Sequence, residues 1–308
     1  MTPNPHNAGA RAAFSTDRRS AAPALAVRWK PGMEPAVLPL TQPLSGVPKL
    51  ALQGISVSYE TTKGTRLIAL DNIDLEVRAG RFVCIVGPSG CGKSTLLHLI
   101  AGVQKPSSGR VLVDDCVVEG PGTDRILIFQ ELGLFPWLTV GENVEFGMKM
   151  KGISKAARQE KIGYYLRLVH LGQFRDSYTH QLSGGMRQRV ALARALATEP
   201  DVLLMDEPFA ALDAQTRDLL HDELERIWAE TGRTIIFVTH NVREAVRLGD
   251  RVVVLTFRPG RVKQEFEIDL PRPRHLEEIE VARTAGEILE HLREEINKSL
   301  EAEYEAHR

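Results

Sequence analysis

The residues from Gly87 to Ser94, GPSGCGKS, have the types and spacing needed to hold a phosphate group. Glycines in this segment allow successive backbone N–H groups to point at one anion, and the N-terminus of a following helix adds partial positive charge. Lys93 would place a compact positive charge at the β- and γ-phosphates of a nucleotide, and the Ser94 hydroxyl could ligate Mg²⁺. The segment therefore predicts a site for a nucleoside triphosphate and its metal ion.

The flanking sequence distinguishes this segment from an ordinary glycine-rich turn. The apolar run Phe82–Val86 precedes it, and a helical pattern from Lys93 to about Ala101, closed by Gly102, follows it. A phosphate-binding loop needs this order of strand, loop and helix. We therefore interpret the segment as a P-loop.

Two adjacent acids, Asp206 and Glu207, come directly after the apolar residues Val202–Met205. In an open α/β sheet the carboxyl ends of parallel strands meet at one edge, so these acids would lie beside the P-loop. Asp206 suits the coordination shell of Mg²⁺, and Glu207 suits a general base that polarises an attacking water. The alternative is that two acids merely end a strand at solvent, but the upstream P-loop favours the catalytic interpretation.

These groups need a sheet to position them, and the apolar patterns predict one. Leu50–Tyr59 alternates as a strand, and Leu67–Leu70 and Ile73–Val77 continue the pattern with an Asp-Asn turn between them. With Thr234–Val238 further along the chain, apolar runs separated by helices indicate a parallel sheet covered on both faces.

Two further segments have helical character. Residues 131–182 are predicted to be mostly helical, and residues 276–308 are highly charged with Ile288, Leu292 and Ile296 at helical spacing. We expect the second segment to form a terminal helix that docks one face, on which these apolar residues lie.

Composition excludes several classes of protein. The chain has 308 residues, 43% of them hydrophobic, and a formal net charge of -1, so it offers no general attraction to nucleic acid or anionic lipid. No apolar stretch approaches the roughly 18–20 residues of a membrane helix, and a membrane role would require partner subunits. The cysteines Cys84, Cys91 and Cys116 have no metal-like spacing and indicate a reducing cytosol.

The first 48 residues differ from the rest in composition and in hydrophobic pattern. They are rich in Ala, Pro, Asn and Ser and lack sustained hydrophobic periodicity, so they are predicted to form a disordered extension. Several arginines and few acids also resemble an organellar transit peptide, but no amphipathic helix is evident. A bacterial extension is the favoured interpretation.

The segment Leu182–Arg189, LSGGMRQR, resembles the signature motif of ABC ATPases. The order of motifs is also similar to that family: P-loop, a glutamine after a strand (Gln130), signature, carboxylate strand, then a histidine after a strand (His240). The resemblance covers about residues 50–255. It implies an α/β fold, namely a P-loop ABC ATPase domain with a mostly parallel core sheet, an antiparallel β part near the N-terminus and a helical subdomain.

The resemblance also implies roles for individual residues. Gln130 would touch Mg²⁺ and the attacking water and sense the γ-phosphate, and His240 would hold that phosphate. A lone histidine is usually structural, but Thr239-His240 closes the strand Thr234–Val238, which favours the functional role. Tyr59 corresponds to the aromatic residue that stacks on adenine, and a tyrosine packed in the sheet stays the alternative.

Ser183 and Gly185 resemble residues that contact the γ-phosphate bound by the opposite subunit, and Asp213 would cross the dimer interface. The expected catalytic residues are Glu207, His240 and Gln130, and the expected ligands of Mg²⁺ are Ser94, Gln130 and Asp206. The residues expected to bind ATP are Tyr59, Gly87, Pro88, Ser89, Gly90, Cys91, Gly92, Lys93, Ser94, Thr95, Ser183, Gly184, Gly185 and Asp213.

Three stretches resemble the nitrate/sulfonate/taurine importer branch of the family: Leu134–Val140 with Glu142–Val144, Arg258–Arg261, and Asp269–Arg274. The resemblance implies an ATPase that energises import of nitrate, a sulfonate, taurine or a similar small anion. The first stretch would also form an apolar groove for a helix of a membrane subunit, unless its apolar residues belong to the domain core. The alternatives are a soluble ABC ATPase not coupled to transport and the ATPase of another class of ABC transporter.

The expected assembly follows from the same resemblance. It comprises a homodimer or paired ATPase subunits, two transmembrane permease subunits and a periplasmic or lipid-anchored substrate-binding protein, with no nucleic acid. The chain would be peripheral at the cytoplasmic face of the inner membrane. Its predicted domains are the extension at residues 1–48, the ATPase domain at 49–275 with a helical subdomain at about 131–182, and a C-terminal helical extension at 276–308.

Overall fold

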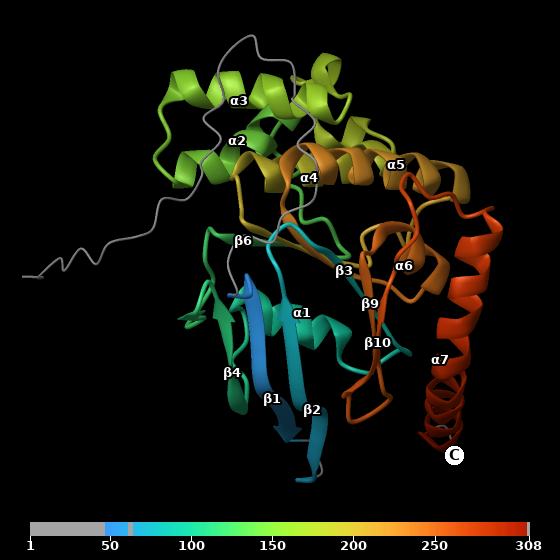
Figure 1. The fold of residues 1–308 in the computed structure, drawn as a ribbon. Coiled ribbons are helices and arrows are strands. Elements are labelled where there is room, and N and C mark those ends of the chain that lie inside the picture. Colours follow the sequence, from blue (N-terminus) through green and yellow to red (C-terminus); the bar gives the residue numbers. More distant parts are fainter. Residues whose placement is uncertain (1–46, 61–63, 307–308) are drawn as a thin grey trace, which may run out of the picture. The chain divides into compact units, whose positions relative to one another are not determined.

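The computed structural model describes residues 47–60 and 64–306 (Figure 1). The extension predicted at residues 1–48 lies outside this part of the chain except for its last two residues. The strands are β1 (Leu50–Glu60), β2 (Arg66–Val77), β3 (Phe82–Val86), β4 (Ser108–Val113), β5 (Cys116–Val117), β6 (Arg125–Ile128), β7 (Val202–Asp206), β8 (Thr234–Val238), β9 (Arg251–Leu255) and β10 (Val262–Glu267). The α-helices are α1 (Lys93–Ala101), α2 (Val140–Met150), α3 (Lys155–Leu168), α4 (Gly184–Ala197), α5 (Ala214–Thr231), α6 (Val242–Leu248) and α7 (Ile279–Ala306).

A six-stranded sheet in the order β10-β9-β3-β8-β7-β6 forms the centre of the described region. Strands β3, β6, β7, β8 and β9 pair in parallel, and β10 is an antiparallel edge strand. Every residue of β3, β7 and β8 is buried, as expected for parallel strands covered on both faces. The predicted parallel sheet is therefore confirmed.

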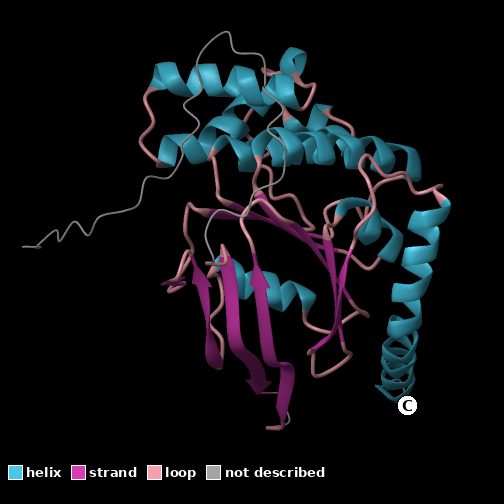
Figure 2. Ribbon diagram, viewed as in Figure 1, coloured by secondary structure: helices cyan, strands magenta, loops and turns pink. Residues whose placement is uncertain are grey.

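The two faces of this sheet belong to different hydrophobic cores. Alternate residues of β3 point to opposite sides, so that Phe82 and Cys84 join the core beneath helices α2–α7, whereas Val83 and Ile85 join the core with α1. Helix α1 lies between the six-stranded sheet and a second, four-stranded sheet, as Figures 1 and 2 show. This packing fixes the helix that follows the P-loop from both sides.

The second sheet, in the order β2-β1-β4-β5, is antiparallel and includes a correction to the predicted strands. The turn expected at Asp71-Asn72 is wrong, because β2 runs without interruption through this point. Asn72 takes a left-handed φ of 49° opposite Gly54 at 59°, and the register between β1 and β2 shifts there. The Asn72 amide donates to Ser56 Oγ at 3.0 Å, so the irregularity is a bulge within the ladder.

The segment from residue 131 to 182 is helical only in part. Helices α2 and α3 occupy much of it, but the chain before α2 forms a loop instead of the predicted helix. The buried Asn143 side chain accepts from the Phe135 amide at 2.9 Å and donates to the carbonyls of Phe135 and Leu138. Thr139 and Glu142 then form a capping box that starts α2. These side-chain bonds satisfy the loop backbone in place of helical bonds.

Helix α7 packs beside α6 and β9, but its buried stripe differs from the expected one (Figure 1). Ile288 and Leu292 are buried, whereas Ile296 is 37% exposed, so its predicted place on the docked face is wrong. The buried stripe continues instead through Glu295 and Ser299, which keeps the helical spacing of four, three and four residues. None of the helices in the described residues is long and apolar enough to cross a membrane. The domain boundaries themselves stay a prediction.

Candidate functional site

The P-loop connects the end of β3 to the start of α1, and its glycines are required by close contacts. A Cβ added at Gly87 would lie 2.7 Å from Cys91 Sγ, and one at Gly92 would lie 2.6 Å from Leu70 Cδ2. Gly92 also has a φ of 101°, which side chains of L-residues rarely adopt. Leu70 comes from β2, so the four-stranded sheet supports the loop from behind.

Lys93 lies across this loop and is only 7% exposed. Its Nζ donates to the carbonyls of Gly87 at 2.9 Å and Pro88 at 3.0 Å. The backbone amides of Ser89 and Gly90 have no hydrogen-bond acceptor among the residues that the structure describes. Free amides around a lysine ammonium fit the oxygens of a phosphate group.

Asp206 ends β7, close to the Ser94 side chain in the first turn of α1. Burial raises the pKa of Asp206 above its ordinary value, and the nearby Glu207 carboxylate adds to this effect, while the Ser94 hydroxyl opposes it. Within the described chain, no group of three or more His, Cys, Asp or Glu side chains could hold a metal ion without further ligands. The Ser94 hydroxyl and the Asp206 carboxylate are oxygen donors, the kind of ligand that Mg²⁺ prefers.

Glu207 and His240 form a direct pair. His240 Nδ1 lies 2.9 Å from Glu207 Oε2, although the residues are 33 positions apart. Glu207 has a left-handed φ of 43°, which is unusual for a residue with a side chain, and its amide donates to the carbonyl of Val238 at 3.0 Å. This strained position at the end of β7 turns the carboxylate toward the residue that follows β8.

The structure thus brings one set of predicted residues together at the carboxyl ends of β3, β7 and β8. Gln130 follows β6, which pairs with β7 at the edge of the same sheet, and it is exposed with no hydrogen-bond partner among the described residues. Tyr59 is 41% exposed, and its hydroxyl accepts a hydrogen bond from Gln104 Nε2 at 2.8 Å. An exposed ring is poorly explained as core packing.

A second set of predicted residues lies elsewhere. Ser183 caps α4 and accepts from the amide of Met186, and a Cβ added at Gly185 would lie 2.6 Å from Thr216 Cγ2. Asp213 caps α5, and the amide and hydroxyl of Thr216 donate to its carboxylate and lower its pKa. The signature residues therefore adjoin the segment that carries Asp213, and no hydrogen bond joins them to the P-loop in the described chain.

Sequence reasoning missed several residues that shape the site. Arg258 Nε donates to the carbonyl of Gly90 at 3.0 Å, so the Arg-Pro-Gly turn after β9 braces the P-loop. Arg217 donates to the carbonyl of Leu212, next to Asp213. The stretch Arg258–Arg261 signalled only family membership, since the contact of Arg258 with Gly90 joins residues 168 positions apart. A cavity of about 30 Å³ beside Glu207 is lined by Phe209, Ala210, Arg217, Thr239, His240, Asn241 and Glu244.

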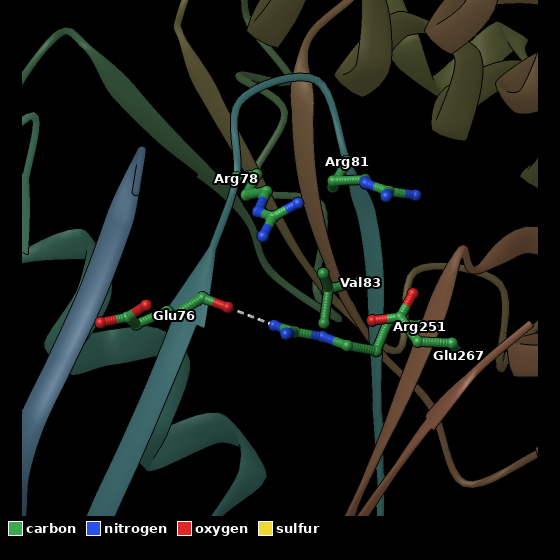
Figure 3. Close-up of a pocket in the computed structure, with 6 residues that line it drawn as sticks. All are labelled: Glu76, Arg78, Arg81, Val83, Arg251 and Glu267. Atoms are coloured by element: carbon green, nitrogen blue, oxygen red, sulfur yellow. Dashed lines mark hydrogen bonds between the residues drawn. The ribbon is translucent and has the colours of Figure 1, made fainter. Parts of the chain in front are cut away.

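A larger cavity of about 310 Å³ lies away from these residues, at the beginning of β3 (Figure 3). Its lining comprises Glu76, Arg78, Arg81, Val83, Arg251 and Glu267. Arg251 donates to the main-chain oxygen of Glu76, which links the two sheets, and pairs with Glu265 at 3.2 Å. Because the P-loop follows the opposite end of β3, this cavity is not part of the phosphate site.

Comparison with known proteins agrees with this geometry. Residues 70–210 match the family model described as "ABC transporter". The chain is 52% identical over 252 residues to the uncharacterized ABC transporter ATP-binding protein MJ0412 of Methanocaldococcus jannaschii, covering 82% of this chain and 94% of that protein. It is 52% identical to the nitrate import ATP-binding protein NrtD of Synechocystis over 67% of this chain and 77% of that protein.

A second transport relative and a solved structure are also similar to this chain. The taurine import ATP-binding protein TauB of Burkholderia pseudomallei is 48% identical, with 73% of this chain and 86% of that protein covered. Among solved structures, the dimeric post-hydrolysis state of the ATP-binding cassette MJ0796 bound to ADP and Pi is similar with a TM-score of 0.64 and 33% identity. That match covers 72% of this chain and 100% of the solved one.

Proposed function

The chain belongs to the family of ABC transporter ATP-binding proteins and is an ATPase, and we propose that two such subunits energise import of a small anion. The observation that carries this proposal is the convergence of Lys93, the Ser94–Asp206 pair and the Glu207–His240 pair at one edge of the parallel sheet. Ligands of open α/β sheets bind at this edge.

Each residue has a chemical task in the proposed mechanism. Lys93 and the free loop amides hold the β- and γ-phosphates, and Ser94, Gln130 and Asp206 hold Mg²⁺. When bound, Mg²⁺ neutralises charge on the phosphate oxygens. Glu207 orients a water and accepts its proton at the carboxylate. His240 binds the γ-phosphate, and its Nδ1 also fixes the position of the Glu207 carboxylate.

The proposed site is completed by a second subunit. Ser183 and Gly185 lie at a helix start suited to an anion, and among the described residues no hydrogen bond joins them to the P-loop of their own chain. In a two-fold dimer each signature would face the partner's P-loop, so two ATP sites would form together. The dimeric form of the similar cassette MJ0796 supports this arrangement.

Contact with a permease is proposed at an aromatic surface that follows Gln130. Phe135 lies 5.6 Å from Trp137 and 4.6 Å from Phe146 between ring centroids, and Trp137 is 70% exposed. An exposed tryptophan beside further aromatic rings suits a helix that docks by an apolar face. Its nearness in sequence to Gln130 would connect docking to the nucleotide.

Import of nitrate, taurine or another small anion is proposed because the relatives named above carry those functions in their names. A substrate-binding protein and two permease subunits would complete the transporter. The chain would then be peripheral to the membrane, held there by the permeases.

The experiment has two arms. The purified chain should hydrolyse ATP with Mg²⁺, and EDTA should stop the reaction. Uptake of labelled nitrate and taurine should fall in a strain that lacks this chain and return when it is restored.

A Trp137→Ala variant should retain hydrolysis and lose uptake, whereas Val117→Ala, at a 53% exposed position on β5, should support both. Hydrolysis without any effect on uptake of either anion would favour another class of ABC ATPase.

A further inference from the structure

A chain of buried polar side chains lies beneath the Glu207–His240 pair and has no part in the mechanism above. His221 on α5 is 0% exposed, Glu244 on α6 is 5% exposed, and Thr239, directly before His240, is 2% exposed. Burial of polar groups costs free energy unless each of them is hydrogen-bonded. Three such groups in contact next to a catalytic pair therefore call for an explanation.

Both oxygens of the Glu244 carboxylate are engaged. His221 Nε2 lies 2.6 Å from Glu244 Oε1, and the Thr239 hydroxyl donates to Glu244 Oε2. These two bonds satisfy both oxygens of the buried carboxylate. Glu244 thus connects α5 and α6 to the residue that precedes His240.

The hydrogen bonds define the tautomer of His221. Arg247 Nη1 lies 3.2 Å from His221 Nδ1, and because arginine has no acceptor, Nδ1 must accept this bond. The ring is then neutral, with its proton on Nε2, and donates to Glu244. Arg247 is 2% exposed and also pairs with Asp218 and Asp222 of α5, which hold it in place.

Thr239 transmits this arrangement to the backbone around His240. Its Oγ1 accepts from the amide of Asn241 at 3.0 Å, so the residues on both sides of His240 are tied together. The Asn241 side chain in turn accepts from the amides of Arg243 and Glu244 at the start of α6. The loop that carries His240 is thus anchored at its base.

His221 also contacts the segment that carries Glu207. Its ring lies 5.4 Å from the ring of Phe209 in an edge arrangement, and Phe209 comes two residues after Glu207. The buried His221 ring therefore contacts both the segment that carries Glu207 and the hydrogen-bonded residues that hold the His240 loop. Helix α5, which holds it, begins at the Asp213 cap expected to face the partner subunit.

We infer that His221 is a positioning residue for hydrolysis, which fixes the His240 loop through Glu244 and Thr239 and the Glu207 segment through Phe209. The inference rests on the proposed roles of Glu207 and His240. Removing His221 would leave a buried carboxylate oxygen without its donor, and the loop would shift to recover one. Small displacements of catalytic groups can lower a rate by about 100-fold.

The first test compares variants of the full chain by single-turnover hydrolysis and by ATP binding. His221→Leu should lower kcat at least about 10-fold, while the Kd for ATP stays within about 2-fold. His221→Gln, whose amide can both donate and accept, should restore most of the rate. Thr239→Val should resemble His221→Leu and provides a second variant if the first does not fold.

Thr234→Val is the matched control, because Thr234 is equally buried at the start of β8, the strand that Thr239 follows, and its hydroxyl oxygen accepts from the Gly80 amide at 3.0 Å. It should keep the wild-type kcat. An equal loss of kcat in Thr234→Val and Thr239→Val would show a general effect on folding and overturn the inference.

The second test places His221→Leu in a His240→Ala background. In that background the loss of kcat should be smaller than in the wild-type chain, because the part transmitted to His240 is gone and only the part that acts on the Glu207 segment through Phe209 remains. An undiminished loss of kcat in that background, or wild-type kcat for His221→Leu alone, would overturn the positioning role and leave the proposed function intact. Wild-type hydrolysis by His240→Ala would instead remove His240 from the mechanism, and the positioning role with it.

Discussion

His240 Nδ1 approaches Glu207 Oε2 to 2.9 Å, and the two residues follow the neighbouring parallel strands β8 and β7. A carboxylate can only accept, so Nδ1 of His240 carries the proton of this bond. Glu207 Oε1 and His240 Nε2 are the atoms that remain for the reacting groups. The pair therefore presents one carboxylate oxygen to a water, and Nε2 can donate to a phosphate oxygen when the ring carries a proton on both nitrogens.

Glu207→Gln should abolish most turnover and preserve binding of ATP. The amide keeps the shape of the side chain but cannot accept a proton, and a general base contributes about 10²–10⁴-fold to a rate. Steady-state hydrolysis and equilibrium binding of a labelled nucleotide measure the two effects. Wild-type turnover by this variant would exclude Glu207 as the base.

Lys93→Ala should weaken ATP binding as well as hydrolysis, since the ammonium lies among the loop carbonyls in a buried position. Its charge would act on the phosphates before and during the reaction, so its removal should destabilise bound ATP and the transition state alike. Titration with labelled ATP checks this. Unchanged affinity would contradict the phosphate-binding role of the loop.

Asp206→Asn should raise the melting temperature of the nucleotide-free protein at pH 7 and lower its hydrolysis. Burial raises the pKa of Asp206, so ionisation of this carboxyl group lowers the stability of the folded protein. This cost disappears when the group is protonated. The advantage of the variant should therefore shrink as the pH falls below the raised pKa and both side chains become neutral. A lower melting temperature for the variant at pH 7 would show that the carboxylate stabilises the fold.

Glu295→Gln should destabilise the attachment of α7. Burial raises the pKa of Glu295, but the bonds from Lys263 Nζ at 2.8 Å and the Phe257 amide at 2.8 Å outweigh it, and the pKa is lowered. Hydrogen bonds to a charged group contribute about 1.5–3 kcal/mol each. Because the folded pKa is depressed, this stability is present above the unfolded pKa of about 4.5 and is lost as the pH falls.

Thermal unfolding of both proteins at pH 7 and at pH 4 checks this prediction, with the larger difference expected at pH 7. Glu294→Gln is the control, because Glu294 also contacts Lys263 but is mostly exposed. Equal effects of the two substitutions would contradict the importance of the buried position.

The sequence predicts the centre of this fold well, because its strands are short apolar runs beside glycines. The structure reproduces the bounds predicted for β3, α1 and β8. It differs at Asp71-Asn72, where a bulge replaces a turn because pairing with β1 continues on both sides. It differs again at Ile296, where Glu295 occupies the buried stripe because Lys263 and the Phe257 amide satisfy its charge.

In the site, too, some features can be predicted from the sequence and others cannot. Residues in local motifs, such as Lys93 and Glu207, can be assigned from spacing alone, and their roles stay predictions until tested. Contacts between distant segments cannot, because nothing in the sequence pairs His221 with Glu244 or Arg258 with Gly90. Only packing of α5 on α6, and of the turn after β9 on the P-loop, brings these residues together.

The most direct test of the composite site is the ATP dependence of dimer formation in the Glu207→Gln variant. ATP should produce a stable dimer by light scattering and ADP should not, since each γ-phosphate would bridge a P-loop and an opposing signature. Adding Ser183→Arg should block this dimer by bulk and charge at the start of α4 while each monomer still binds ATP. Ser154→Arg, at the exposed cap of α3, should leave the dimer unchanged. If the variant carrying both Glu207→Gln and Ser183→Arg dimerises with ATP as well as Glu207→Gln alone, the signature does not face the partner's nucleotide, and the shared site is wrong.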